Sequence, residues 1–188
     1  MDYSKERALL CVGHLVIMER MKSPDRHKHW RLLYRLKPTA GALGSLCEEN
    51  YRLLRQLAPG LEEMRGRFIS QIPHHPPLMI DITREGPFTS RVRLTHLFRI
   101  VEDGPLHPDP DLTMKIYSDT GQVEVLEIKN QQRLPVQGLY RTPGLQQKWQ
   151  ANLFLGNWLT YCYKKGYSFR KGAGGEFRDP LPESLEIA

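Results

Sequence analysis

The segment from Tyr140 to Gly166 constrains the fold of this chain more than any other, because it has the composition of one long helix with defined ends. Thr142 is placed to cap the helix, and Pro143 suits the first helical position, where its missing N–H costs nothing. Two lysines followed by Gly166 form a cationic end at which a helix stops. We therefore expect a helix from about residue 144 to about residue 165.

One side of this predicted helix is apolar. Its apolar residues recur at three- and four-residue spacing: Ala151, Phe154, Leu155, Trp158, Leu159 and Cys162. Polar residues between them are expected to face water: Gln146, Gln147, Gln150 and Asn157. Such a stripe must be buried against another element, so the helix is predicted to cover a sheet.

Segments between residues 78 and 128 alternate apolar and polar residues, a period typical of strands with one buried face. The apolar positions are Leu78, Ile80 and Ile82; Val92, Leu94, Phe98 and Ile100; Leu112, Met114 and Ile116; and Val123 and Val125. Turn residues at 118–121 join the last two segments in a hairpin. Beyond Val125 the apolar residues change face, which predicts a bulge. A short last strand is expected at 137–140.

Helical patterns precede these strands. A capping-box pattern that begins at Ser45 predicts a helix from about 46 to 58, which Pro59 and Gly60 stop. A second short helical piece is predicted from Leu61 to Ile69. The order of elements predicts an α+β fold: an antiparallel meander of four to five strands, packed on one face by an N-terminal helix and a long C-terminal helix.

The chain of 188 residues is long enough for one domain with a sizeable core. Three regions are expected: a basic helical leader or arm at 1–36, a single α+β domain at 37–166 and a flexible tail at 167–188. No apolar run approaches the roughly 20 residues that span a bilayer, so no membrane span is expected. Three scattered cysteines without a C-x-x-C pair indicate buried or inert thiols and a cytoplasmic location.

Two stretches resemble a small proteobacterial family of unknown function typified by YqiB. The predicted C-terminal helix carries a pattern that members share, formed here by Lys148, Gln150, Asn152, Phe154, Leu155, Trp158, Leu159 and Cys162. Cys47, Glu48, Asn50 and Tyr51 are similar to the family's N-terminal helix. The resemblance covers about residues 37–166 and implies the fold and the cytoplasmic location, but no activity. Gln146 and Gln147 stand where the family often has an acidic pair.

The formal net charge is +6, and the leading segment carries most of the excess. From Met1 to Lys37 there are nine basic and four acidic residues. The basic positions Arg26, Lys28, Arg31 and Arg35 are candidates for binding an acidic macromolecule, either RNA, DNA or protein. A basic segment that only aids solubility has the same composition.

The solvent face of the predicted sheet is a second candidate. Arg91, Arg93 and Arg99 on one strand, with Lys115 and Tyr117 on another, would place cations beside an aromatic ring. Surfaces that bind single-stranded nucleic acid combine these groups. The alternative is cross-strand ion pairing, with Asp81 and Glu124 as candidate partners, and the composition favours this alternative.

Catalytic or metal sites have weaker support. His107, Asp109 and Asp111 are grouped in a predicted loop at 105–111, which could serve acid–base chemistry or simply form a polar turn. His96 is expected to be a hydrogen-bonded core residue. The remaining histidines have no spacing diagnostic of a metal site, and no cofactor-binding motif is recognised.

Three functions therefore remain open. The first is a non-enzymatic binding or regulatory protein that engages an acidic partner through the leader and the arginines of the sheet. The second is an enzyme that acts on a small anionic metabolite at a His/Asp site. The third is an assembly protein that docks through its leader. The sequence does not predict an oligomeric state.

Overall fold

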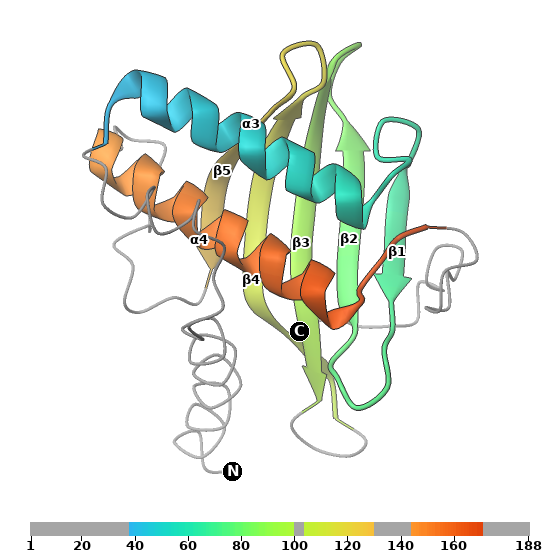
Figure 1. Ribbon diagram of the computed structural model, residues 1–188. Coiled ribbons are helices and arrows are strands. Elements are labelled where there is room, and N and C mark those ends of the chain that lie inside the picture. The colour runs from blue at the N-terminus through green and yellow to red at the C-terminus, as the bar shows by residue number, and fades with distance from the viewer. Residues whose placement is uncertain (1–37, 100–103, 130–143, 171–188) are drawn as a thin grey trace.

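A computed structural model describes residues 38–99, 104–129 and 144–170 (Figure 1). The described residues form a five-stranded antiparallel sheet in the order β1-β2-β3-β4-β5, with two helices across one face. The elements are α3 (Ala40–Leu57), β1 (Gly66–Ser70), β2 (Leu78–Arg84), β3 (Thr89–Arg99), β4 (Leu106–Tyr117), β5 (Gln122–Lys129) and α4 (Leu145–Lys165). The predicted α+β meander is confirmed.

The core lies between the helices and the sheet. Alternate residues of the strands point toward the helices, as Leu94 and Leu112 do when they pair across β3 and β4 with no exposed surface. The helices lie side by side and run in the same direction, so that both begin beyond the β5 edge of the sheet (Figure 1). Leu54 and Trp158 are fully buried. Removal of this apolar surface from water is the main stabilising contribution to the fold.

Helix α4 closes the core with the predicted apolar stripe, all of which is buried. The backbone N–H of Gly144 donates to Oε1 of Gln147 at 3.0 Å and caps the start of the helix. The predicted cap at Thr142 and Pro143 lies outside the described residues. At the other end Gly166 adopts a left-handed conformation with φ 90°, as predicted. The expectation that Asn157 faces water is wrong: it is buried and donates to the carbonyl of Leu153.

Helix α3 begins earlier than predicted. Thr39 is the N-cap, and its Oγ1 accepts a 3.1 Å hydrogen bond from the N–H of Ala42. The residues around Gly41 therefore belong to the helix. The capping-box pattern at Ser45 lies inside the helix, because a stronger cap precedes it and the intervening small residues continue the helix.

The predicted helical piece from Leu61 to Ile69 is wrong. Residues 61–63 form a turn and residues 66–70 form β1, which pairs with β2 so that Phe68 lies opposite Ile80. Local composition in this stretch permits a helix, but the unpaired edge of β2 offers backbone partners. Pairing with β2 therefore decides the conformation of this stretch, and β1 completes the five-stranded sheet. The strand expected at 137–140 lies outside the described residues.

Two register shifts in the sheet bear on the predictions: one lies near a segment that was predicted as a loop, and the other is a predicted bulge. The loop predicted at 105–111 is largely the first half of β4, which pairs with β3 through a register shift between Thr95 and Leu97. In β5 the register shifts at Leu126, so that Ile128 returns to the core face. This is the bulge that the change of apolar face predicted.

The described part of the chain continues past α4 to Arg170. Tyr167 and Phe169 are buried, and the N–H of Phe169 donates to the carbonyl of Leu57 at 2.7 Å. The tail was predicted to begin at 167, so its first residues belong to the packed domain instead. Among the described helices, none has the length and hydropathy needed to cross a membrane.

Candidate functional site

The face of the sheet away from the helices carries the candidate arginines. We call it the arginine face and define it by Arg67 of β1, Asp81 of β2, Arg91 and Arg93 of β3, and Lys115 of β4. Arg93 lies opposite Asp81 on β2, and Arg91 lies opposite Lys115 on β4. Their neighbours Val92 and Met114 point into the core. The alternation of β3 and β4 therefore places the cations on the side that the helices leave uncovered.

Most of these cations are paired. Nε of Arg91 lies 2.5 Å from Oε1 of Glu85, and Nζ of Lys115 lies 3.1 Å from its Oε2. The hydrogen bonds from Arg91 and then Lys115 lower the pKa of Glu85. Nε of Arg67 lies 2.9 Å from Oδ2 of Asp81. The favoured alternative of ion pairing across strands thus describes this face.

Arg93 differs from its neighbours because its partner is buried. Nε and Nη2 of Arg93 donate to the two oxygens of Asp111 at 2.7 and 2.9 Å. The Asp111 side chain is 3% exposed, whereas that of Arg93 is 28% exposed. The hydrogen bonds that Arg93 donates to Asp111 raise the pKa of Arg93. Arg93 therefore neutralises a buried carboxylate, with Lys129 more distant at 3.9 Å.

Two of the predicted residues lie at opposite ends of this face. Arg99 is near the far end of β3, where its Nη1 donates to the carbonyl of Gly104 at 3.2 Å. Tyr117 ends β4 opposite Thr89 and is half-buried. The structure thus groups Arg91, Arg93 and Lys115 but does not bring Arg99 beside them. The leader candidates Arg26, Lys28, Arg31 and Arg35 lie outside the described residues.

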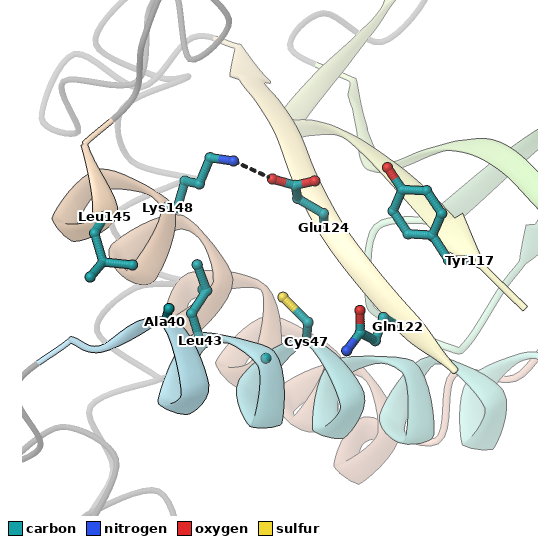
Figure 2. A pocket seen from close by; sticks show the side chains of 9 residues that line it. Ala40, Leu43, Cys47, Tyr117, Gln122, Glu124, Leu145 and Lys148 are labelled. Carbon is teal, nitrogen blue, oxygen red and sulfur yellow. Dashed lines mark hydrogen bonds and ion pairs between the residues drawn. The ribbon is translucent and has the colours of Figure 1, made fainter. Parts of the chain in front are cut away.

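A hollow of about 460 Å³ opens where both helices begin (Figure 2). Helix α3 contributes Leu43 and Cys47, which point toward a Lys148–Glu124 ion pair on the far side (Figure 2). The end of the β4–β5 hairpin contributes Tyr117. Because Lys115 lies opposite Glu124 in the β4–β5 pairing, the hollow adjoins the arginine face.

Polar groups beside the hollow join the two helices. Nδ2 of Asn50 donates to the backbone carbonyl of Asn152 at 3.0 Å, and the Cys47 thiol lies 3.8 Å from Oδ1 of Asn152. Nδ2 of Asn152 donates in turn to the carbonyl of Lys148. Burial, and next the charge of Glu124, raise the pKa of Cys47 to about 12. The thiol is therefore protonated at neutral pH and is a poor nucleophile.

The sequence did not predict this arrangement. The hydrogen-bond partners of Asn152 are on α3 and α4. The sequence did contain part of the information, because the family resemblance is carried by stretches that include Cys47, Asn50, Lys148 and Asn152. Gln150, from the same stretch, points away and is exposed. Finding the site required knowing that the two helices pack side by side.

His96 is the core residue that the sequence predicted. It is fully buried, and its Nδ1 accepts a 3.2 Å hydrogen bond from the indole N–H of Trp158. Burial, and to a lesser extent the charge of His75, lower the pKa of His96 to about 3. The imidazole is therefore neutral at physiological pH, which suits a structural role rather than proton transfer.

The three residues predicted as a weak catalytic group lie on a strand and not in a loop. His107, Asp109 and Asp111 lie along β4, and Asp111 is engaged by Arg93. Asp109 is buried at the register shift. Within residues 38–99, 104–129 and 144–170, no group of three His, Cys, Asp or Glu side chains is placed to hold a metal ion.

The described residues define an α+β protein in which two helices cover one face of an antiparallel meander. The chain belongs to a family described as a protein of unknown function (DUF1249), which matches residues 53–168. This confirms the resemblance stated from the sequence. The uncharacterised protein YqiB of Escherichia coli strain K12 is 27% identical over 135 residues, which are 70% of this chain and 94% of YqiB. The YqiB proteins of Escherichia coli O6:H1 (strain CFT073) and O157:H7 match to the same extent. No solved structure matches.

Proposed function

We propose that this protein is a cytoplasmic, non-enzymatic binding or regulatory protein that engages an acidic macromolecule through its arginine face and its basic leader. One observation carries the proposal: the helices cover a single face of the sheet, and Arg91 and Lys115 remain 48% and 28% exposed on the other. Cations on an uncovered sheet face are accessible to a large partner such as a nucleic acid or a protein.

The ion pairs on this face are compatible with binding. An exposed ion pair contributes about 0–1 kcal/mol, so a phosphate or carboxylate of a partner can replace Glu85 beside Arg91 and Lys115 at small cost. The same pairs hold the cations in fixed positions before the partner arrives, which reduces the ordering cost of binding. Arg93 is not available in this way, because its departure would leave Asp111 buried and unpaired.

The charge of the leader supports the same partner chemistry. Nine basic and four acidic residues precede residue 38, and the whole chain carries +6. Clustered positive charge accelerates encounter with polyanions and makes affinity depend on salt, because bound cations release counterions. Scattered cysteines without a pairing motif support a reducing compartment.

The test uses the full chain and two fluorescent probes, a single-stranded RNA oligonucleotide and a polyglutamate peptide. Fluorescence anisotropy should show that at least one probe binds, and that its affinity falls by about tenfold or more between about 50 and 200 mM salt. Replacing both Arg91 and Lys115 by Ala should weaken binding about tenfold, which corresponds to about 1.4 kcal/mol.

Helix α3 offers a matched control. Arg52 and Arg55 are 57% and 53% exposed and lie 2.6 and 4.0 Å from carboxylates, so their joint replacement by Ala removes an equal charge from another surface. This variant should bind like the wild-type protein. Equal losses in the two double variants, or an affinity that does not change with salt, would rule out the arginine face as the binding surface.

A deletion of residues 1–36 separates the leader from the sheet. If the leader and the face act together, the deletion should weaken probe binding while the Arg91 and Lys115 variant retains a residual, salt-dependent affinity. If the leader instead docks on another protein subunit, the deletion would leave probe binding unchanged, and this result would favour the assembly function over our proposal.

A further inference from the structure

The hollow between α3, α4 and the β4–β5 hairpin has the dimensions of a small-molecule site. Its volume of about 460 Å³ falls within the range of roughly 300–1,000 Å³ typical of ligand pockets. Such pockets combine apolar walls with a few convergent polar groups. The lining of this hollow has both, and the two kinds of group lie on different sides of it (Figure 2).

The charged side consists of one ion pair. Nζ of Lys148 lies 2.7 Å from Oε1 of Glu124, so a helix and a strand each contribute one charge at the same place. The two side chains are 36% and 32% exposed. A pair with this exposure is worth about 0–1 kcal/mol, so a ligand can separate the two groups at small cost.

The apolar side is formed by the first turns of the helices. Ala40 and Leu43 of α3 and Leu145 of α4 line it. Leu145 is 39% exposed, so part of its apolar surface faces the solvent. An apolar ligand group placed against these three side chains would remove their surface from water.

The charges limit the ligands that fit. A simple anion would satisfy Lys148 but leave Glu124 facing it, and a simple cation would satisfy Glu124 but repel Lys148. A molecule with adjacent ammonium and carboxylate groups supplies a partner to each side chain and leaves neither unpaired. The neutral thiol of Cys47 adds no further charge to this balance.

From this complementarity we propose that the hollow binds a small zwitterion with an apolar side chain, that is, the chemistry of an aliphatic α-amino acid. Its carboxylate would face Lys148, its ammonium group would face Glu124, and its side chain would contact Leu43 and Leu145. Tyr117 at the end of β4 also lines the hollow. The site adjoins the arginine face but does not use Arg91 or Lys115, so separate variants test the two proposals.

Ligand selectivity on the wild-type full chain is the first test. L-Leucine, 4-methylpentanoate and 3-methylbutylamine share the same branched alkyl group, but the last two each lack one charge. Titrations followed by the backbone amide signals of the labelled protein should show L-leucine shifting signals around the hollow and binding at least about tenfold tighter than either analogue. Equal binding of one analogue, or no shift with millimolar L-leucine, would overturn the proposal.

Variants of the charged pair form the second test. Lys148→Met and Glu124→Gln keep the size of each side chain and remove its charge, and each should weaken L-leucine binding about tenfold or more. The control is the ion pair of Arg67 and Asp81. Its N–O distance of 2.9 Å is similar, but it lies on β1 and β2, at the other edge of the sheet from the hollow. Asp81→Asn should leave L-leucine affinity unchanged. If Lys148→Met and Glu124→Gln bind L-leucine like the wild-type protein, the ion pair does not recognise the ligand and the proposal is wrong.

Discussion

The indole N–H of Trp158 donates a 3.2 Å hydrogen bond to Nδ1 of His96, and this bond joins α4 to β3 inside the core. It fixes the neutral tautomer of the imidazole, with the proton on Nε2, because Nδ1 accepts. Among the described residues Nε2 has no hydrogen-bond partner. The ring is otherwise surrounded by aromatic side chains, with that of Tyr167 at 5.2 Å between centroids. Protonation of this site would place a charge in a fully buried position.

Acid should therefore unfold the protein in a defined range of pH. The pKa of His96 is about 3 in the folded protein and about 6.5 when unfolded, so the unfolded state binds the extra proton first. The stabilising contribution of the neutral ring is complete above about pH 6.5 and is lost progressively as the pH falls toward 3, on the order of a few kcal/mol. Urea unfolding between pH 7 and pH 4 measures it.

The control for this prediction is His96→Leu. This variant leaves the Trp158 indole N–H without an acceptor and should cost about 1–3 kcal/mol at pH 7. Its stability should nevertheless depend less on pH than that of the wild-type protein. Parallel pH profiles for the two proteins would show that His96 does not cause the acid sensitivity.

Arg93 and Arg91 should differ sharply in their effects on stability. Arg93→Ala leaves the buried carboxylate of Asp111 without its bidentate partner and should cost about 3 kcal/mol. Arg91→Ala breaks an exposed pair and should change stability by less than about 1 kcal/mol. Chemical denaturation gives both values. Adding Asp111→Asn to Arg93→Ala should recover part of the loss, and a double variant as unstable as the sum of the single ones would contradict this explanation.

Asn50 and Asn152 should act as a coupled pair. Asn152→Ala leaves Nδ2 of Asn50 with one acceptor fewer at a position without exposed surface and should cost about 1–3 kcal/mol. Asn50→Ala should cost a similar amount. In a double-mutant cycle the two losses should overlap by about 0.5–3 kcal/mol, because both variants remove the hydrogen bond between the two side chains. Strict additivity would mean that these bonds contribute nothing to the packing of the helices.

Two glycines offer a matched test of backbone conformation. Gly166 has φ 90°, so Gly166→Ala should destabilise the end of α4 by about 1–2 kcal/mol. Gly41 lies in the first turn of α3, and no atom lies within 4 Å of the position that a Cβ would take. Gly41→Ala should therefore be neutral or stabilise the protein by up to about 1 kcal/mol. Thermal unfolding of both variants measures the contrast. A gain of stability in Gly166→Ala would show that this helix end does not depend on the left-handed residue.

The elements with strong periodicity could be predicted from the sequence. The apolar stripe of α4 and the alternation in β2, β3 and β4 each depend on local repeats that burial enforces. β1 could not be predicted, because five residues of mixed composition become a strand only beside β2. The cap at Thr39 was missed because Thr39 and Ser45 both precede the same apolar residues, and the pattern at Ser45 was preferred.

The candidate sites divide in the same way. Alternation along β3 and β4 was enough to place Arg91, Arg93 and Lys115 on one face. It did not reveal that Glu85 from a turn and Asp111 from the register shift would be their partners, because both contacts depend on side chains meeting across strands. The hollow depends on the relative placement of two helices that are far apart in the chain, since its lining residues Cys47 and Lys148 are 101 positions apart.

The contact of Phe169 with the last residue of α3 bears on how the chain is made in the cell. A strand meander can pair in the order of its synthesis, since each strand meets the one before it. The apolar layer over that meander is complete only when α4 and the residues after it have left the ribosome. Until then the part of the nascent sheet that α4 covers remains open to water, and we expect a chaperone that binds aliphatic surface to act at this stage of synthesis.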